Sequence, residues 1–420
     1  MPQNWKTHKL GEVANIGSSK RIFRADYVSS GIPFYRSKEI IQKSFGDAIN
    51  DILYISPDKY FSIKKKYGAP ITGDVLLSAV GNRSGIPYLV NDDGEFYFKD
   101  GNLMWLRDFK LSIDSSFLVY WFKSAVGQHY LNSLMIGSAQ KALTIEGVKT
   151  ISINLPPLPE QKAIANILSA IDAKIENNLA INKTLEEMAM AFYKEWFVDF
   201  VPFQDGKFIE SELGMIPEGW EVKRLEEILE IKRGGSPRPI KDFISDSGLP
   251  WLKISDATAA NSPFQYSTKE YIKPEGLRKT VLIKPGAIIL SNSATPGLPR
   301  LIEFETCIHD GWLHFPEIKR FNRYFLYLLF LDIKEHLISQ GNGSVFTNLK
   351  TDILKSQNVK IPPLKIEEQF LNKINSKFEK IRENTVEIQT LTQLRDTLLP
   401  KLVSGEVRLN EFDLEEVLEN

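Results

Sequence analysis

The most regular pattern of apolar and polar positions lies in two long segments without interior glycine. In the first, Glu160–Val198, apolar positions recur at alternating spacings of four and three residues, and Asn178 and Asn182 occupy two of these positions. The second runs from Ile366 to the residue before Pro400. Such a recurrence over several heptads predicts helices that pair along a seam. The predicted seam residues are Ile164, Leu168, Ile171, Ile175, Leu185, Phe192 and Trp196 in the first segment and Phe370, Ile374, Phe378, Ile381, Ile388, Leu391 and Leu398 in the second.

Each segment is also compatible with a single amphipathic helix packed on a globular body. Two such segments at equivalent places in one chain favour pairing with each other in antiparallel order, with one globular domain at each end. About 39 residues at 1.5 Å each give a rod of roughly 60 Å. Asn178 and Asn182 would cost stability but fix the register of the pair, unless they face solvent at a local irregularity.

Outside the long segments, short apolar runs alternate with glycine and proline, which is typical of strands joined by turns. The pattern predicts strands within Asp74–Val80 and Ala287–Ser291. It predicts one helix over Phe117–Leu134 and another over Arg323–Gln340, each followed by a glycine. A Pro-Pro pair after each helix marks a firm boundary before the next long helix, because proline cannot continue a helix.

The chain repeats the same order of residues after 206 to 215 positions. Glycines, prolines and apolar residues return, and the small changes of offset indicate insertions in the loops of a shared scaffold. Because this period is far longer than that of solenoid repeats, the sequence predicts a duplicated domain. Matching positions include Trp5 and Trp220, Leu10 and Leu225, Gly31 and Gly248, Gly85 and Gly297, Asp100 and Asp310, and Pro156 and Pro362.

We therefore predict an α+β fold with two globular domains of α/β type, two long antiparallel coiled-coil helices between them, and a pseudo-two-fold internal duplication. The first globular domain covers residues 1–154, and the central long helix covers residues 155–200. A linker and the second globular domain cover residues 201–360. The C-terminal long helix, residues 361–400, pairs with the central one, and an acidic tail follows at residues 401–420.

The composition is typical of a globular protein. Of the 420 residues, 43% are hydrophobic and 25% are charged, and this length favours two or three domains. No run approaches about 18 apolar residues and no signal-peptide core begins the sequence, so we expect a cytoplasmic protein. The single cysteine, Cys307, excludes an internal disulfide and a Cys-rich zinc site.

The net charge of −1 conceals a segregation of charge along the chain. Residues 1–150 carry a net charge of +5 and residues 231–360 carry +6, whereas residues 151–230 carry −8 and residues 361–420 carry −4. The positive blocks coincide with the globular segments, and basic patches placed in this way can bind a polyanion. The alternative is chance variation in a neutral protein.

The sequence lacks the common catalytic motifs. It has no Gly-rich phosphate loop ending in Gly-Lys-Ser/Thr, no G-x-G-x-x-G and no H-E-x-x-H, and its five histidines are scattered. Asn154 begins a segment similar to the Asn-Pro-Pro-aromatic loop of amino-methyltransferases, but Leu155 interrupts it. Asp310, Glu317 and Lys319 match a weak nuclease pattern that the first copy does not repeat. We therefore predict a binding scaffold without catalytic residues or metal ligands, and not an enzyme.

Basic and polar residues on the predicted loops of the two globular domains are the candidates for contact with nucleic acid. Arginine suits bidentate contact with guanine, glutamine suits adenine, and lysine mainly contacts phosphate. For any single residue, solvent exposure alone is the simpler explanation, so only the whole set has weight. The predicted DNA-binding residues are Lys20, Arg21, Arg36, Lys64, Lys65, Arg83, Gln140, Lys141, Arg238, Lys253, Arg278, Lys279 and Arg300.

Three motifs give nearly the whole chain a resemblance to the specificity subunits of type I restriction–modification systems. They are Leu155-Pro-Pro-Leu-Pro-Glu-Gln-Lys-Ala-Ile164, Phe192-Tyr-Lys-Glu-Trp-Phe-Val-Asp-Phe200 and Thr397-Leu-Leu-Pro-Lys-Leu-Val-Ser-Gly-Glu-Val407. Gly235-Ser-Pro-Arg238, followed by Gly248-Leu-Pro-Trp251, also looks like the opening of a target-recognition domain. The second copy departs from the family's Pro-Leu-x-Glu-Gln pattern at residues 363–369, which leaves the start of the second long helix open.

The resemblance implies a non-catalytic subunit that provides the sequence specificity of a multi-subunit methyltransferase and endonuclease. Each target-recognition domain would read one half of a bipartite, asymmetric site in double-stranded DNA. The paired helices would set the spacer and dock two methyltransferase subunits that methylate adenine, and translocase–endonuclease subunits would join them. No cofactor is expected in this chain, because S-adenosylmethionine, ATP and magnesium belong to the partner subunits. The alternative function is that of a helical scaffold or adaptor with two protein-binding globular domains; neither reading involves a membrane.

Overall fold

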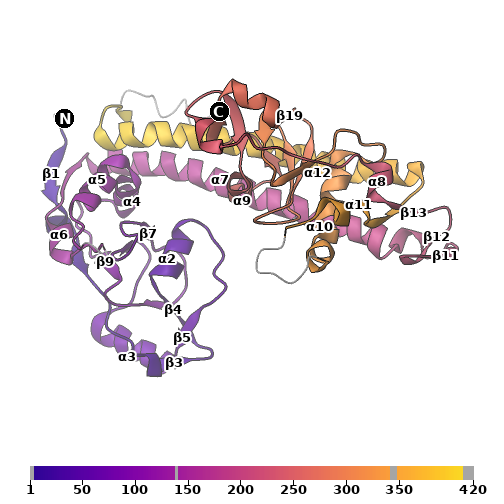
Figure 1. Cartoon of the computed structure of the whole chain (residues 1–420). Coiled ribbons are helices and arrows are strands. Elements are labelled where there is room, and N and C mark those ends of the chain that lie inside the picture. The colour runs from indigo at the N-terminus through magenta and orange to yellow at the C-terminus, as the bar shows by residue number, and fades with distance from the viewer. Residues whose placement is uncertain (1–3, 138–140, 341–347, 410–420) are drawn as a thin grey trace. The chain divides into compact units, whose positions relative to one another are not determined.

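The structure is a computed structural model that describes residues 4–137, 141–340 and 348–409 (Figure 1). Short strands and short helices make up most of it, and two long helices, α7 (Leu158–Tyr193) and α12 (Leu364–Ser404), stand out. In the described part of the chain, no helix combines the length and the apolar composition that crossing a membrane requires.

The chain divides into two compact units. Unit 1 combines residues 1–176 with residues 390–420, and unit 2 consists of residues 177–389. Each unit therefore contains one globular domain and a part of both long helices. The domain boundaries predicted from the sequence treat the long helices as separate elements, whereas the structure groups the beginning of α7 and the end of α12 with the first globular domain.

The described residues of unit 1 form two four-stranded sheets and one two-stranded sheet. The first sheet has the order β2 (Asn15–Gly17), β9 (Leu103–Arg107), β6 (Val75–Ser78) and β7 (Pro87–Leu89). The second has the order β3 (Tyr27–Val28), β5 (Leu53–Ile55), β4 (Ile32–Tyr35) and β8 (Tyr97–Phe98), and β1 (Lys6–Lys9) pairs with β10 (Ser152–Leu155). The helices are α1 (Leu10–Val13), η1 (Arg24–Asp26), α2 (Ser37–Ser44), α3 (Pro57–Tyr67), α4 (Ser115–Lys123), α5 (Ala125–Ser133) and α6 (Ile145–Lys149).

Unit 2 repeats this plan with additional strands. One sheet has the order β14 (Lys232–Arg233), β23 (Trp312–His314), β20 (Ile288–Ser291), β21 (Pro299–Ile302) and β17 (Phe264–Gln265). The other has the order β15 (Ile244–Ser245), β18 (Glu270–Ile272), β16 (Leu249–Leu252), β22 (Thr306–Ile308) and β19 (Val281–Ile283). The pairs β13 (Glu221–Arg224) with β24 (Asn358–Ile361) and β11 (Phe208–Ser211) with β12 (Gly214–Pro217) complete the strands. The helical elements are η2 (Lys194–Val198), η3 (Val201–Phe203), α8 (Leu225–Ile228), η4 (Ile240–Asp242), α9 (Ile254–Ala259), η5 (Pro274–Lys279), α10 (Arg323–Ser339) and α11 (Thr351–Lys355).

The strand pairings confirm the duplication and the predicted α+β fold. In unit 1 the parallel pair β4 and β8 places Phe34 beside Tyr97, and in unit 2 the parallel pair β16 and β22 places Trp251 beside Cys307. These strands lie at equivalent places in the two copies. On its other side, β4 pairs with β5 and β16 pairs with β18, both in antiparallel order. The predicted strands within Asp74–Val80 and Ala287–Ser291 are confirmed as β6 and β20.

The repeated Gly-x-Pro turn has a steric explanation. Gly31 has a φ of +151° and Gly248 a φ of +127°, in a region that residues with a Cβ rarely adopt. A Cβ at either position would also lie within 3.0 Å of a backbone carbonyl oxygen, that of Ile55 in one unit and that of Ile272 in the other. Glycine is therefore required at the same turn in both copies.

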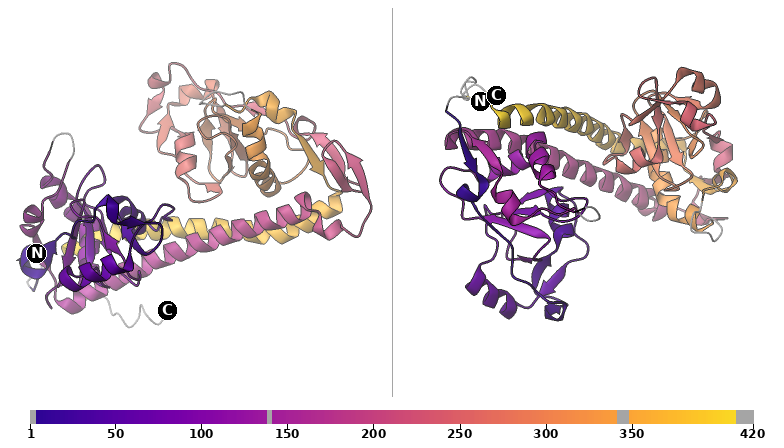
Figure 2. Two further views of the ribbon diagram at one scale, coloured as in Figure 1. Left: turned by 90° about the horizontal axis from the view of Figure 1, so that it is seen from below. Right: turned by 60° about the vertical axis from the view of Figure 1, so that its left-hand side comes forward.

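Helices α7 and α12 run antiparallel in each unit, and both views of Figure 2 show them side by side. In unit 1, Asp172 of α7 accepts a hydrogen bond from Arg395 of α12 at 3.0 Å. In unit 2, Asn178 of α7 donates to Glu387 of α12 at 2.8 Å. Four residues further along α7 in the same unit, Asn182 accepts a hydrogen bond from Asn384 of α12 at 2.9 Å, so going forward along α7 means going backward along α12.

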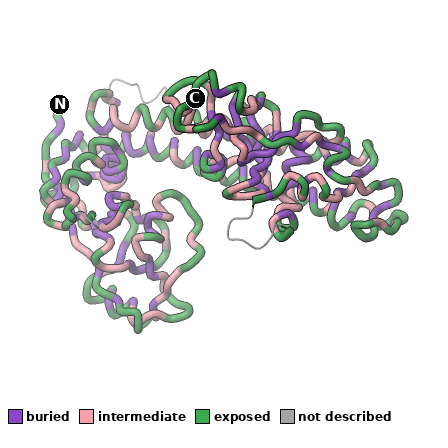
Figure 3. Tube along the Cα trace, viewed as in Figure 1, coloured by how far each residue is buried: buried purple, intermediate pink, exposed green. Residues whose placement is uncertain are grey.

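The predicted seam positions are buried or half-buried, and Figure 3 colours the chain by burial. Leu185, Phe192, Ile388, Leu391 and Leu398 are half-buried. The other nine are buried: Ile164, Leu168, Ile171, Ile175 and Trp196 on the first segment and Phe370, Ile374, Phe378 and Ile381 on the second. Asn178 and Asn182 are 1% and 3% exposed, so the alternative that they face solvent is wrong.

The predicted single helix over Phe117–Leu134 is wrong. Ser124 is extended, with a ψ of 158°, and separates α4 from α5. Its hydroxyl accepts a hydrogen bond from the N–H of Gly127 and so caps α5. A Cβ on Gly127 would collide with the backbone of Trp121, which shows how closely the two helices meet at this break.

The predicted end of the second long helix is also wrong, because α12 continues through Pro400 to Ser404. A proline removes one backbone donor, and this loss is small within the last two turns of a helix of 41 residues. Leu402 and Val403 are buried in the core of unit 1, which favours the additional turn. Of the predicted acidic tail, residues 410–420 lie outside the described residues.

Candidate functional site

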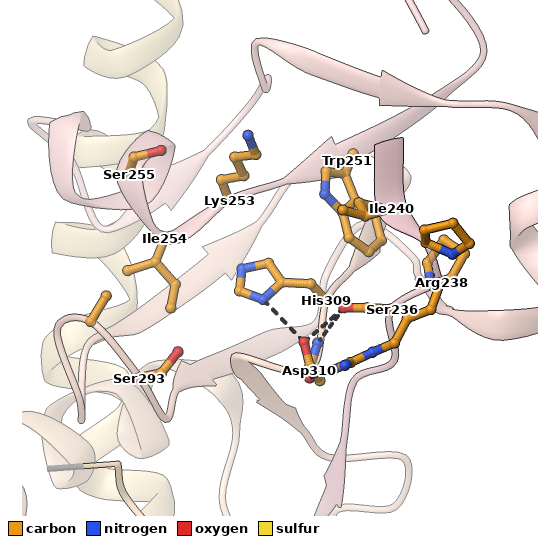
Figure 4. Close-up of a pocket in the computed structure, with 13 residues that line it drawn as sticks. Ser236, Arg238, Ile240, Trp251, Lys253, Ile254, Ser255, Ser293, His309 and Asp310 are labelled. Atoms are coloured by element: carbon orange, nitrogen blue, oxygen red, sulfur yellow. Dashed lines mark hydrogen bonds and ion pairs between the residues drawn. The ribbon is translucent and has the colours of Figure 1, made fainter. Parts of the chain in front are cut away.

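A cavity of about 780 Å³ opens in the second globular domain, where loops from four strands meet. Figure 4 shows the side chains that line it. Ser236 and Arg238 come from the loop after β14, Trp251 lies in β16, and His309 and Asp310 follow β22. All of these belong to unit 2.

Asp310 is the centre of a hydrogen-bonded group at this cavity. The Ser236 hydroxyl donates to Asp310 Oδ1 at 2.7 Å, and Arg238 Nη2 lies 3.4 Å from Oδ2. The hydrogen bond from Ser236, together with the nearby positive charge of Arg233, lowers the pKa of Asp310. Its carboxylate is therefore ionised at neutral pH and holds the guanidinium of Arg238 at the mouth of the cavity.

Aromatic rings form another wall of the cavity. Trp251 is buried, and its ring centroid lies 5.9 Å from that of His309. Burial lowers the pKa of His309, so this imidazole is neutral at pH 7. Lys253, two residues after Trp251, forms an ion pair with Glu270 and lines the same cavity. The cavity thus combines an apolar wall, two cations and a fixed carboxylate, a combination suited to phosphates and to the polar edges of bases.

The first globular domain carries the same arginine–aspartate pair. Arg21 Nε lies 2.9 Å from Asp100 Oδ2, at the positions that match Arg238 and Asp310. Arg36, at the position that matches Lys253, is held instead by Glu39, with Nη2 at 2.5 Å from Oε1. The two domains therefore share one ion pair and differ in the surroundings of the next basic residue.

The cavity includes Arg238 and Lys253, but the other predicted DNA-binding residues do not line it. Arg278 and Lys279 are exposed on η5, and Lys64 and Lys65 are exposed in the last turn of α3. Lys20, Arg21, Arg83 and Lys141 are exposed and Arg36 is half-buried, all within unit 1, and Gln140 lies outside the described residues.

The predicted loop position of Arg300 is wrong. Arg300 lies in strand β21 opposite Ile289 of β20, and only 7% of its surface is exposed. Its Nε and Nη2 both donate to the backbone oxygen of Ala257. The turn at Gly297 ends before β21 begins, so this side chain points into the domain and contributes to its packing.

The sequence placed Asp310 in the repeat, opposite Asp100, and in a weak nuclease pattern, but not among the predicted DNA-binding residues. Glu317 and Lys319 do not line the cavity, and their backbones pair with Glu230 and Ile228 instead. Within residues 4–137, 141–340 and 348–409, no group of three or more His, Cys, Asp or Glu side chains is arranged to hold a metal ion. The signal that could have identified the role of Asp310 is its repetition, together with Arg238, as Asp100 and Arg21.

The fold defines a class of protein in which a duplicated α+β domain is carried on two long helices. The family model described as "Type I restriction modification DNA specificity domain" matches residues 2–187 and residues 217–394. The chain belongs to this family. It is a specificity subunit of a type I restriction–modification system and thus a non-catalytic component of that system.

Relatives are similar over nearly the full length of the chain. The MjaIX specificity subunit of Methanocaldococcus jannaschii is 27% identical over 430 residues, which cover 98% of this chain and 95% of that protein. The HindI specificity subunit of Haemophilus influenzae is 25% identical over 472 residues, which cover 96% and 100%. The crystal structure of the S subunit from M. genitalium has a TM-score of 0.59 and 18% identity, with 95% and 96% of the chains covered, and thus shares the fold.

Proposed function

We propose that each globular domain reads one half of a bipartite, asymmetric DNA sequence and that the paired helices set the distance between the halves. The observation that carries this proposal is the duplication: one chain presents two copies of a domain, and the strand order of each unit 1 sheet recurs in unit 2 with one strand added. Two unlike readers on one chain can address a site that is not palindromic, which a symmetric dimer cannot.

The cavity of unit 2 supports the DNA part of the proposal. Arg238 and Lys253 supply positive charge, and the half-buried or exposed polar groups around them can meet base edges. In unit 1, Arg21, Lys20 and Lys64 are exposed on the corresponding domain. Contacts with phosphate make affinity fall steeply with salt, and this dependence separates DNA reading from the alternative, a protein-binding adaptor.

The two long helices support the spacing part of the proposal. Helix α7 has 36 residues and α12 has 41, and ion pairs and hydrogen bonds link them in antiparallel order in each unit. Removing one heptad from α7 and the facing heptad from α12 preserves the seam and shortens the pair by about 10 Å. Since a base pair adds about 3.4 Å along DNA, the required spacer should shrink by about three base pairs.

We further propose that the outer surfaces of the helices dock two methyltransferase subunits that methylate adenine, and that translocase–endonuclease subunits join this assembly. In this scheme, S-adenosylmethionine, ATP and magnesium bind to those partner subunits, and this chain holds no cofactor. The place of action is the cytoplasm, where such a complex meets DNA.

Mapping of methylated adenines in cells that express this chain with the methyltransferase of its own system tests the proposal. The expected result is a split motif with a constant spacer. Replacing residues 1–154 with those of a relative should change one half of the motif only, and the paired heptad deletion should change only the spacer. Methylation without a motif, or a simultaneous change of both halves, would show the proposal to be wrong.

A further inference from the structure

The arginine–aspartate pair occurs at the same place in both globular domains. Arg21 and Arg238 lie in the loops after β2 and β14, and Asp100 and Asp310 precede β9 and β23. The pair joins these two elements at 2.9 Å in the first domain and at 3.4 Å in the second. Its position is thus part of what the duplication has retained.

In each pair, the cation is more exposed than the carboxylate. The side chains of Arg21 and Asp100 are 69% and 17% exposed, and those of Arg238 and Asp310 are 80% and 40% exposed. Exposed ion pairs of this kind contribute little to stability. In both pairs the aspartate is the less exposed partner. Its role is better explained as orienting the arginine side chain toward solvent.

The guanidinium has donors to spare in both pairs. Arginine carries five N–H donors, and the aspartate takes one nitrogen, Nε in Arg21 and Nη2 in Arg238. The remaining donors can hold a phosphate oxygen or the edge of a guanine, which are both targets that arginine binds in bidentate fashion.

Repetition distinguishes between these two targets. Two domains that read different half-sites cannot obtain that difference from a side chain that they share, because the shared chemistry would select the same base in both. A side chain next to the aspartate that differs between the copies, His309 in one and Lys99 in the other, can supply the difference. What every half-site has in common is its sugar–phosphate backbone.

We propose that Arg21 and Arg238 each bind a backbone phosphate at the same place relative to their half-site, independently of its sequence. Asp100 and Asp310 are positioning residues that orient the two arginines. This inference rests on the proposed function, and it assigns base discrimination to the positions at which the copies differ. The arginines would then set the orientation of each domain on the duplex before any base is read.

The test uses the full chain in complex with its methyltransferase subunits and measures binding to duplexes across a salt series. Arg21→Ala and Arg238→Ala should each weaken binding about tenfold for every duplex, and should each reduce the slope of log affinity against log salt by about 0.9. The order of preference among duplexes with single base changes should stay that of the parent protein. Arg238→Lys should restore most of the lost affinity, because lysine binds phosphate as a point charge but cannot reproduce a bidentate contact with guanine.

Arg224→Ala is the matched control, because Arg224 forms an exposed ion pair with Glu226 in the same unit and does not line the cavity. Its affinity and salt slope should stay close to those of the parent. If Arg238→Ala loses discrimination at one base pair and Arg238→Lys does not restore it, the contact is with a base and the inference is wrong. Unchanged affinity in both alanine variants would show a purely structural pair and would equally overturn it. If the parent complex prefers no duplex at all, the proposed function itself fails, which is a separate result.

Discussion

The two globular domains share their strand order but are fastened to the long helices in different ways. In unit 1, the hydroxyl of Tyr120 in α4 donates to Asp172 of α7 at 2.9 Å, and Arg395 of α12 binds the same carboxylate. In unit 2, the ring of Tyr324 in α10 stacks on Phe378 of α12 with centroids 4.6 Å apart. Unit 2 also uses tyrosine–carboxylate hydrogen bonds, from Tyr327 to Glu186 of α7 and from Tyr324 to Glu379 of α12, and the stacking on Phe378 is added to them. The duplication has thus retained the scaffold while some of the contacts on it have changed.

Several of the residues that the two copies share are required by the geometry of the backbone. Gly31 and Gly248 occupy the same turn with positive φ and the same close approach to a carbonyl oxygen. By contrast, Gly81 with a φ of +94° is matched by Ala294 with a φ of +56°, a position where a Cβ is tolerated. The comparison teaches that a repeated glycine is structurally required only where both the conformation and the available space demand it.

The largest expected effect tests this shared turn. Gly31→Val and Gly248→Val should each unfold their own globular domain, because a side chain would combine a strained φ with a collision against a backbone carbonyl. We expect a loss of more than about 3 kcal/mol in the free energy of unfolding, measured by chemical denaturation with a probe in each unit. Gly286→Val is the control, since its φ is +92° but the described residues leave open space around its Cβ position. It should cost only about 1–2 kcal/mol, and an equal loss in all three variants would refute the steric explanation.

The next effect compares the helix packing in the two units. Phe370 is fully buried and contacts the rings of Tyr193, Trp196 and Phe197, whereas its equivalent in unit 1 is the smaller, aliphatic Ile164, which is buried in the core of that unit. Phe370→Ala should reduce the free energy of unfolding by about 3–5 kcal/mol, and Ile164→Ala by about 2–5 kcal/mol with the smaller loss of the two.

Thermal unfolding of both variants measures this difference. Leu394→Ala provides the control, because its side chain is 44% exposed and its removal should change stability by less than about 0.5 kcal/mol. A larger loss for Ile164→Ala than for Phe370→Ala would contradict the view that the aromatic cluster is the stronger attachment.

A smaller effect concerns the polar layer inside the helix pair of unit 2. Asn384 donates to Asn182 at 2.9 Å, and both are at most 3% exposed. Asn384→Leu alone should cost about 1–3 kcal/mol, because it leaves the carbonyl of Asn182 buried without this donor. The double variant Asn182→Leu/Asn384→Leu should recover most of that loss, since an apolar pair needs no hydrogen bond.

The double variant also tests whether this layer fixes the register. With the hydrogen bond gone, the helices can slide, so methylation mapping should show tolerance of more than one spacer length. A double variant that is as unstable as the single one, or that keeps a single spacer, would show that the layer does not specify the register.

The sequence predicted the features that depend on local periodicity and on repetition. The paired helices, the strands β6 and β20 and the duplication follow from spacings that can be counted along the chain. The break at Ser124 could not be predicted, because the closeness of Gly127 to Trp121 arises only when two helices pack at an angle. For Arg300 the loop prediction failed because a turn and the strand after it look alike when both are short.

The candidate site was predictable only in part for a similar reason. Arg238 and Lys253 were identified by their charge, but a cavity forms from loops that are distant in sequence and meet through sheet pairing. The neighbours that complete it, Trp251 and His309, carry no charge pattern that distinguishes them from core residues. The repeated Asp-Gly step at Asp310 was visible in the sequence. That Arg238 lies next to this aspartate was not.

The smallest expected effect is a difference in pH dependence between the two units. Cys307 of β22 is fully buried, and burial raises the pKa of its thiol to about 11, whereas the equivalent residue of unit 1 is Tyr97. An unfolded cysteine has a pKa of about 8.5, so the unfolded state loses its thiol proton first and gains stability relative to the folded state as the pH rises from about 8.5 to about 11. The contribution of this thiol is thus fully present below pH 8.5 and is lost above it.

Unit 2 should lose stability over this interval more steeply than its Cys307→Ala variant, as measured by denaturation at pH 7.5 and pH 9.5. In addition, the native thiol should react with a thiol reagent far more slowly than the denatured one at pH 8. A Cys307→Ala protein with the same pH dependence as the parent, or rapid labelling of the native protein, would show that this thiol is not shielded.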